Sequence, residues 1–246
     1  MQAFGGQARL DFTESLETMT ADRVAMLGRL ARLIAAGDSR QPFVLRVCEA
    51  GKVLVGGLGC SISINSDDAG GRMTVAATDD VAAKLENLQE VLGEGPCHQA
   101  YRDNEAVVTA LRENAEGQWP EFTRSARDIA GDITIHCVPM RPAGQLFGVF
   151  TVYTDDELTE PPELLQFLAS AVGIAVLHDP ESLHSQGIWA TRSVIHQATG
   201  MVVVQLAVPP DDALAIIRAH AFAHGATVHE IAQLIVNRRL DFRENT

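Results

Sequence analysis

The chain has few cysteines, and their positions do not suit a disulfide framework or a structural metal site. The 246 residues contain four cysteines, Cys48, Cys60, Cys97 and Cys137, and no two of them form a C-x-x-C pair. Zinc knuckles need closely spaced ligands, and disulfide-stapled domains need a higher density of cysteine. The sequence therefore predicts reduced thiols inside a globular fold, without a metal.

The sequence also lacks a long apolar run and a secretory signal. No stretch approaches the roughly 18 apolar residues that a membrane helix needs. Residues 1–6 do not place a basic segment before an apolar one, as a secretory signal does. We therefore expect a cytoplasmic protein without membrane contact. Its hydrophobic content of 46% is typical of a globular chain, and its length suits two domains.

A surplus of basic residues is missing as well. The formal net charge is −13, and residues 188–246 contribute nothing to it because they hold five arginines and five acidic residues. The acidic body formed by residues 1–187 repels nucleic acid at long range. Any nucleic-acid contact is therefore expected in the neutral C-terminal part, where binding would depend more on the shape of the partner than on charge.

Three helix signals follow one another in this C-terminal part. Apolar residues at helical spacing predict a first helix over 188–206. A Pro-Pro-Asp-Asp segment at 209–212 predicts the start of a second helix, because proline fits the first turn and carboxylates favour the positive end of the helix dipole. Thr227 and Glu230 have the spacing of a capping box, which opens a third helix predicted over 228–240. Together they predict a small three-helix bundle.

The residues within these helices resemble a known family. The first helix contains Ile195–Leu206 (IHQATGMVVVQL), the second contains Asp212–Leu214 and Ile217–Ala221, and the third contains Glu230–Val236 (EIAQLIV). In this order and spacing, over about 55 residues, the segment resembles the ANTAR family of RNA-binding antitermination domains. The resemblance implies a domain that binds hairpin loops of structured RNA.

The elements upstream follow another recognisable order. An apolar stripe at spacings of three and four predicts an amphipathic helix over about 13–37 that needs a partner. The expected elements after it are helices over 43–52, 80–88, 96–101, 119–129 and 161–177, and strands over 58–64, 72–78, 106–108, 133–138 and 146–153.

This order resembles the GAF modules that precede ANTAR domains in bacterial regulators. The resemblance includes Leu92–Cys97 (LGEGPC), Trp119–Phe122 (WPEF) and Pro139–Met140 before Gly148. It implies an α+β fold, in which a mixed or antiparallel sheet has its flanking helices packed on one side and is followed by the three-helix bundle. The implied division of the chain is a GAF-like sensor and dimerisation domain at 1–178, a linker at 179–187 and an ANTAR-like RNA-binding domain at 188–246.

GAF domains place small ligands between the sheet and a loop-helix segment. The resemblance leaves open whether this domain binds such a ligand or serves as a dimerisation scaffold, and the sequence identifies no cofactor. His136 and Cys137 are neighbours on a predicted strand, so only one of them can enter a common pocket. No base or carboxylate is fixed beside the Cys-His pairs for catalysis. The residues expected around the pocket are Glu94, Cys97, His98, Tyr101 and His136.

Arginine and glutamine can pair with phosphates and with base edges, which makes them the first candidates for RNA contact. Arg238 and Arg239 form the densest positive cluster of the C-terminal part. At the expected end of a helix, their alternative role is to favour the helix dipole. The candidates for RNA contact are Arg192, Gln197, Arg218, Arg238 and Arg239.

The two resemblances imply an RNA-binding transcription antitermination regulator rather than an enzyme. As a homodimer it would stabilise hairpin RNA against formation of a terminator, with the GAF domain as sensor or scaffold. The alternatives are a ligand-responsive or redox-responsive GAF protein whose C-terminal helices only mediate assembly, or a GAF-domain enzyme. Duplex DNA is disfavoured as a partner, because the third helix is expected to carry arginine only at its far end. The sequence does not identify the ligand, the RNA target or the means of activation.

Overall fold

The computed structural model describes residues 4–65, 72–112, 117–155, 158, 160–179 and 188–243. Within these ranges, side chains are described from residue 19 onward, except those of residues 65, 188–190 and 192. The helices are α1 (Phe4–Ala36), α2 (Phe43–Val55), α3 (Asp80–Leu92), α4 (Pro96–Asp103), α5 (Pro120–Ala130), α6 (Pro162–Leu177), α8 (Ile188–Leu206), α9 (Pro210–Ala223) and α10 (Val228–Val236), and η1 (Pro142–Gly144) is a 3-10 turn. The strands are β1 (Gly59–Asn65), β2 (Arg72–Ala77), β3 (Val107–Ala110), β4 (Thr134–Met140) and β5 (Gly148–Thr154). Every helix and strand expected over residues 13–177 is present, although α1 begins at Phe4 and not near residue 13. The linker expected at 179–187 lies outside the described residues, apart from Asp179.

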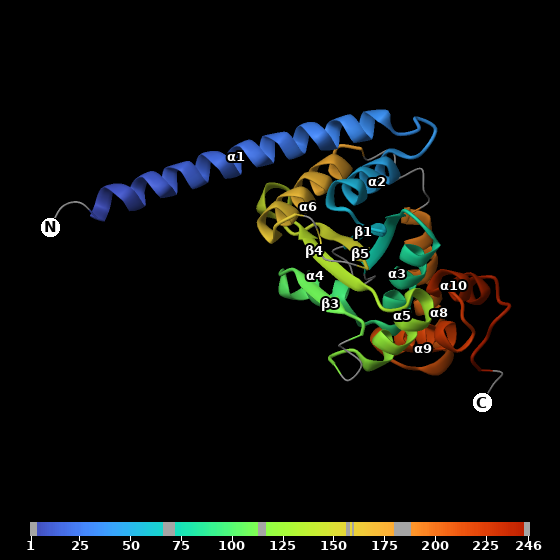
Figure 1. Ribbon diagram of the computed structural model, residues 1–246. Coiled ribbons are helices and arrows are strands. Elements are labelled where there is room, and N and C mark those ends of the chain that lie inside the picture. The colour runs from blue at the N-terminus through green and yellow to red at the C-terminus, as the bar shows by residue number, and fades with distance from the viewer. Residues whose placement is uncertain are drawn as a thin grey trace.

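The five strands form one antiparallel sheet in the order β2-β1-β5-β4-β3. Helices cover both of its faces, as Figure 1 shows. Alternate residues of β5 point to opposite faces: Phe150 and Val152 pack with α2 and α6, whereas Val149 and Tyr153 pack with the helices α3, α4 and α5. The expectation of helices on one side is wrong, because β4 and β5 are buried at nearly every position and need cover on both faces.

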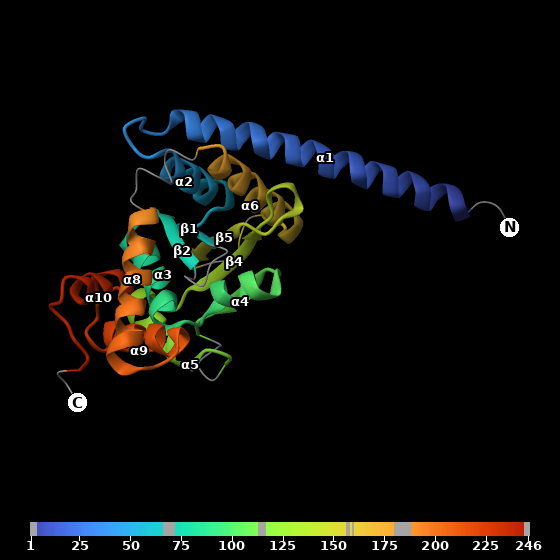
Figure 2. The same ribbon diagram turned by 180° about the vertical axis from the view of Figure 1, so that it is seen from behind.

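Helix α1 packs on the body of the protein only near its C-terminal end. Met26 and Leu30 are buried against α2 and α6, and the N-terminal half of the helix extends past the body (Figures 1 and 2). Arg23 interrupts the apolar stripe, and its guanidinium lies over the ring of Phe167 at 5.2 Å from the ring centroid. Val24 remains 65% exposed and Leu27 42% exposed. The helix therefore presents apolar side chains that the described residues of its own chain do not cover.

The C-terminal helices α8, α9 and α10 form the expected three-helix bundle. Its core contains Ile195, Val202, Ile217 and Ile235. Within the described residues, no single helix is long and apolar enough to cross a membrane. Helices α8 (from Ser193) and α9 reach that length only as a pair bent by 105°, and both contribute to this buried core.

The ends of α10 differ in how well the sequence predicts them. Its start is the expected capping box, in which Thr227 Oγ1 accepts from the Glu230 backbone N–H at 3.1 Å and Glu230 Oε2 accepts from the Thr227 N–H at 2.8 Å. The helix ends at Val236, so the expected end at residue 240 is wrong. Arg238 adopts a left-handed backbone conformation (φ 55°), and the Arg239 N–H donates to the Leu234 carbonyl at 2.8 Å. These two arginines lie in the turn after the helix.

Candidate nucleic-acid interface and sensor-domain cavity

A groove of about 490 Å³ runs along α10 on the surface of the bundle. One wall is the turn between α9 and α10, and the other is formed by the exposed side of α10 with the turn that follows it. Amide, guanidinium and apolar groups lie together here, as contacts to base edges, phosphates and base faces require. The lining residues are Gly225, Ala226, Glu230, Ile231, Gln233, Leu234, Asn237 and Arg239.

The cations at this groove are available for an outside partner. Among the described residues, neither Arg238 nor Arg239 has an ion-pair partner, and both are exposed. Arg243 is engaged instead: its Nη2 lies 2.6 Å from Asp241 Oδ2, and its hydrogen bonds lower the pKa of Asp241 to about 2. The local positive charge offered to a ligand therefore comes from the pair 238–239.

Glu230 is the acidic group of the groove, and its role is structural. The backbone N–H and hydroxyl of Thr227 donate to its carboxylate, which lowers the pKa of Glu230. The carboxylate stays ionised and fixed at the start of α10, where it complements the helix dipole. Its negative charge limits the attraction of a phosphate, which agrees with the expectation of binding by shape more than by charge.

Two groove residues were missed by the sequence reasoning, namely Gln233 and Asn237. The Gln233 amide nitrogen lies 2.9 Å from His229 Nε2, and this contact fixes the orientation of the amide. The signal was present in the sequence, since residues 230, 233, 234 and 237 recur at spacings of three and four and share one side of a helix. The candidates drawn from the sequence were four arginines and Gln197, and they left out these two amides of α10 and its C-cap, which are good partners for base edges.

The other expected RNA contacts do not line this groove. Gln197 is exposed on α8. Arg192 belongs to α8 by its backbone, but its side chain lies outside the described part of the chain. Arg218 lies on α9 and is turned toward α3 of the preceding domain. Of the five candidates, the structure brings Arg239 into the groove with Arg238 beside it.

The space between the sheet and α3 in the first domain is filled by a buried polar network. Arg72 Nη1 lies 2.6 Å from Glu86 Oε2, and the Ser61 hydroxyl donates to Glu86 Oε1 at 2.6 Å. The cavity that remains has a volume of about 10 Å³, which is the room for about one water molecule. Its lining residues are Cys60, Ser61, Ala82, Leu85, Glu86, Gln89, Ile135, Thr151 and Tyr153.

Cys97 and His98 are held in place by the same helix, α3. Gln89 Oε1 accepts from the Cys97 backbone N–H at 2.8 Å, and His98 Nε2 lies 3.0 Å from the Gln89 carbonyl. Burial lowers the pKa of His98 to about 4, so its ring is neutral at pH 7. The Cys97 and Cys137 sulfurs lie 3.1 Å apart, and burial raises the pKa of the Cys137 thiol. Cys137 therefore stays protonated and is a poor nucleophile.

The remaining pocket candidates are dispersed. His136 lies on the opposite face of the sheet from Cys137, with its Nε2 3.5 Å from the Thr154 hydroxyl. Tyr101 packs against the core around Cys97, and Glu94 is half-buried in the turn between α3 and α4. Within the described residues, no group of three or more His, Cys, Asp and Glu side chains has an arrangement that could hold a metal ion.

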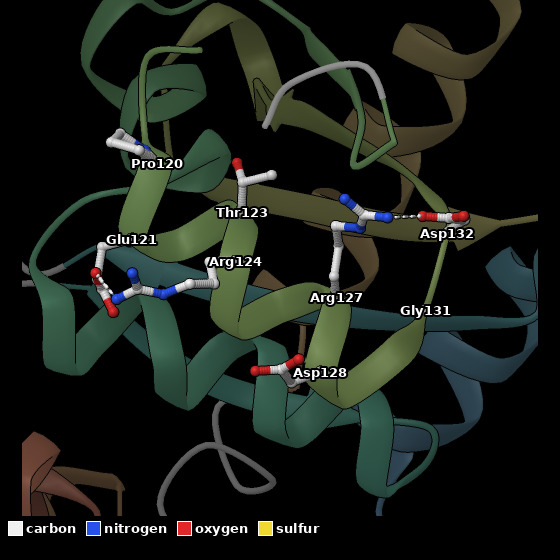
Figure 3. A pocket seen from close by; sticks show the side chains of 8 residues that line it. All are labelled: Pro120, Glu121, Thr123, Arg124, Arg127, Asp128, Gly131 and Asp132. Atoms are coloured by element: carbon white, nitrogen blue, oxygen red, sulfur yellow. Dashed lines mark hydrogen bonds and ion pairs between the residues drawn. The ribbon is translucent and has the colours of Figure 1, made fainter. Parts of the chain in front are cut away.

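A larger surface groove of about 840 Å³ lies beside α5, as Figure 3 shows. Two arginines line it, and both are paired with acids of the same groove. Arg127 Nη2 lies 3.0 Å from Asp132 Oδ1, and Arg124 forms an ion pair with Glu121. These pairs neutralise the guanidinium charges, and Asp128 adds a further acidic group to the lining, so the groove does not favour an anionic ligand.

Comparisons with known families identify both halves of the chain. The family model of the GAF domain matches residues 39–176, and that of the ANTAR domain matches residues 186–236. No curated protein matches the chain. These matches assign the sensor fold and the groove-bearing bundle to different domains.

Several solved structures of GAF domains are similar to this chain. The GAF domain of nlh2 from A. aeolicus in an inactive state has 12% identity and a TM-score of 0.40, covering 63% of this chain and 92% of that chain. The GAF domain of a phosphoenolpyruvate-protein phosphotransferase from Coxiella burnetii has 15% identity and a TM-score of 0.45, covering 65% and 96%. The phycocyanobilin-bound GAF domain of a cyanobacterial phytochrome has 10% identity and a TM-score of 0.41, covering 66% and 96%.

Proposed function

The chain belongs to the GAF–ANTAR regulators, and from this premise we propose that it is a transcription antitermination protein that binds hairpin RNA through the groove along α10. ANTAR is an RNA-binding antitermination domain and GAF a sensor domain. The observation that carries the proposal is the groove itself, where the guanidinium group of Arg239, two amides and an exposed leucine lie on one surface, and where no described residue forms an ion pair with Arg239. A hairpin loop presents phosphates and unstacked bases that such a surface can contact.

The regulator acts as a homodimer in the cytoplasm, without catalysis. Two copies offer two α10 grooves, which suit an RNA with two hairpins. Protein bound to one RNA fold shifts the population away from the competing terminator stem by the difference in its affinity for the two folds. The uncovered apolar side of α1 at Val24 and Leu27 supports association of two chains.

The GAF domain serves as scaffold and relay in this proposal. The small volume of its cavity supports this role over binding of a small molecule, since ligand pockets have volumes of roughly 300–1,000 Å³. The buried Arg72–Glu86 pair occupies the space where a ligand would lie. Any signal would then act on the packing of α3 and its neighbours.

The test replaces the cations of the groove. We expect Arg238→Gln with Arg239→Gln to weaken binding of a two-hairpin RNA and to reduce the slope of log affinity against log salt by about one for each phosphate that the variant no longer binds. A base contact would appear as a decrease in affinity of roughly 5- to 150-fold at one loop position. Fluorescence anisotropy over a salt series measures both quantities.

A matched control removes the same charge from the other domain. Arg102 and Arg124 are 71% exposed in their side chains, and Arg102→Gln with Arg124→Gln should leave affinity and salt slope close to those of the unmodified protein. Circular dichroism confirms the fold of each variant. If the 238–239 variant is folded and binds as the control does, the groove is not the RNA-binding surface.

A further inference from the structure

The two domains touch through α3 and α9, which lie side by side (Figure 2). Val91 of α3 is only 5% exposed, and it belongs to the apolar core of the ANTAR bundle rather than to the core of its own domain. The last turn of α3 therefore forms part of the surface on which the ANTAR domain rests. This contact fixes the orientation of that domain relative to the GAF sheet.

Arg218 is the charged centre of the contact. Its Nη1 lies 3.1 Å from the position that a Cβ on Gly93 would take. Gly93 caps α3 in a left-handed conformation (φ 68°), so the absence of a side chain lets the guanidinium approach the end of the helix. Helix C-termini carry partial negative charge, and a cation there is favourable. The ANTAR domain is thus anchored by its own arginine on the helix end of its sensor domain.

The anchor is incompletely satisfied. Arg218 Nε is buried without a hydrogen-bond partner among the described residues, and within them no ion pair joins Arg218 to the nearby Glu90. Burial raises the pKa of Glu90 and lowers that of Arg218, each shift being opposed by the charge of the other group. A buried donor without a partner is unfavourable. Phosphate oxygens would offer Arg218 the paired acceptors that α3 does not provide.

Helix α3 also connects this anchor to the interior of the GAF domain. Glu86 is bound to Ser61 of β1 and to Arg72 of β2, and Gln89 holds the start of α4 through Cys97. A change in packing around these groups would displace the helix on which Arg218 rests. The same helix therefore contacts both the polar core of the GAF domain and the ANTAR domain.

We propose that the α3–α9 contact is an autoinhibitory dock, in which the end of α3 occupies Arg218 and withholds the α9 face from RNA until the domains separate. The inference rests on the proposed RNA-binding function and names its regulation. In the undocked arrangement Arg218 adds a contact from α9 to those of the α10 groove. Docking and RNA therefore compete for this arginine, and release of the dock raises RNA affinity. Conversely, bound RNA favours the undocked arrangement, because the coupling between two linked equilibria is reciprocal.

The test places a like charge beside Arg218 in the full chain. Glu90→Arg should separate the domains, seen as a larger radius of gyration in small-angle X-ray scattering, and should raise affinity for a two-hairpin RNA about tenfold. Glu90→Gln, which keeps the shape of the side chain, should change both quantities in the same direction by less. The matched control is Glu105→Arg at an exposed position after α4, which changes net charge equally and should alter neither quantity beyond a small general effect.

The Arg218→Gln variant distinguishes the role of Arg218 in the domain contact from its role in RNA binding. It should enlarge the radius of gyration as Glu90→Arg does, yet without any gain in RNA affinity, because the arginine that RNA would use is gone. The dock is overturned if the Glu90 variants are folded and retain the radius of gyration and affinity of the control. If the Glu90 variants separate the domains while no protein, including the unmodified one, binds RNA, the dock stands as a domain contact and the RNA-binding function fails.

Discussion

Single residues in the GAF core show where local sequence patterns stop being informative. Alternation of Ser61 and Ser63 with Ile62 and Ile64 predicts the strand β1 correctly. The serines are nevertheless buried, because Glu86 of α3 and Arg72 of β2 provide their partners. Such partners come from other elements, and no spacing within one strand reveals them. The same limit applies to Arg218, whose neighbours at the end of α3 lie far away in sequence.

His98 gives a prediction at this scale. Its pKa of about 4 in the folded protein lies below the ordinary value of 6.5, so its contribution to stability is fully present above pH 6.5 and is lost as pH falls toward 4. Between pH 7 and pH 5, we expect the free energy of unfolding to fall by about 2 kcal/mol from this group. The free energy of unfolding of the His98→Gln variant should lack this pH-dependent decrease. Urea denaturation of both proteins at the two pH values measures it, and an identical pH dependence would contradict the prediction.

Elements were predictable where their signals are local. The caps of α3 and α10 depend on side chains within three residues of the backbone groups that they bind, as Asp79 and Thr227 illustrate. The end of α10 was missed because its signal is weak: Asn237 forms the C-cap, and neither glycine nor proline stands at residues 237–239 to mark the stop more strongly. Arg238 supplies the left-handed residue instead. The arginines of the groove consequently project from a turn, and the sequence reasoning had placed them on the helix.

The capping box gives a prediction for the element. Thr227→Ala removes the acceptor for the Glu230 N–H at the start of α10, and we expect it to lower the free energy of unfolding of the ANTAR bundle by about 1 kcal/mol. Thr227→Ser keeps the hydroxyl and should preserve most of that stability. Thermal or urea unfolding of the two variants distinguishes them. Equal stability of the alanine and serine variants would show that the box contributes little.

At the scale of the whole molecule, packing decides which apolar faces remain for a partner. The sequence shows apolar stripes on both α1 and α6, and both suggest a bundle across a dimer axis. In the structure, Leu165, Leu168 and Val172 of α6 are buried in the core of their own chain. Most of the α6 stripe therefore covers the sheet. On α1, Met19, Val24 and Leu27 remain exposed among the described side chains, and the N-terminal half of the helix extends beyond the body.

We predict a homodimer formed through this exposed side of α1. Light scattering should give about twice the mass of one chain. Val24→Glu with Leu27→Glu should yield a folded monomer, because both side chains are exposed and the chain's own core does not depend on them. Val108→Glu, at a residue that is 61% exposed on β3, is the matched control and should remain dimeric. An unmodified protein that is monomeric at micromolar concentration would exclude the dimer.

The most direct measurement of the central claim compares nucleic acids on the unmodified full chain. A two-hairpin RNA and a DNA duplex of equal charge are titrated with the protein over a series of salt concentrations. The neutral ANTAR domain should bind the hairpin RNA with an affinity at least about tenfold higher than its affinity for the DNA duplex at every salt concentration. The slope of log affinity against log salt should be shallow, because few phosphates are contacted. Equal affinity for both, or no retention of the RNA even at low salt, would contradict the account.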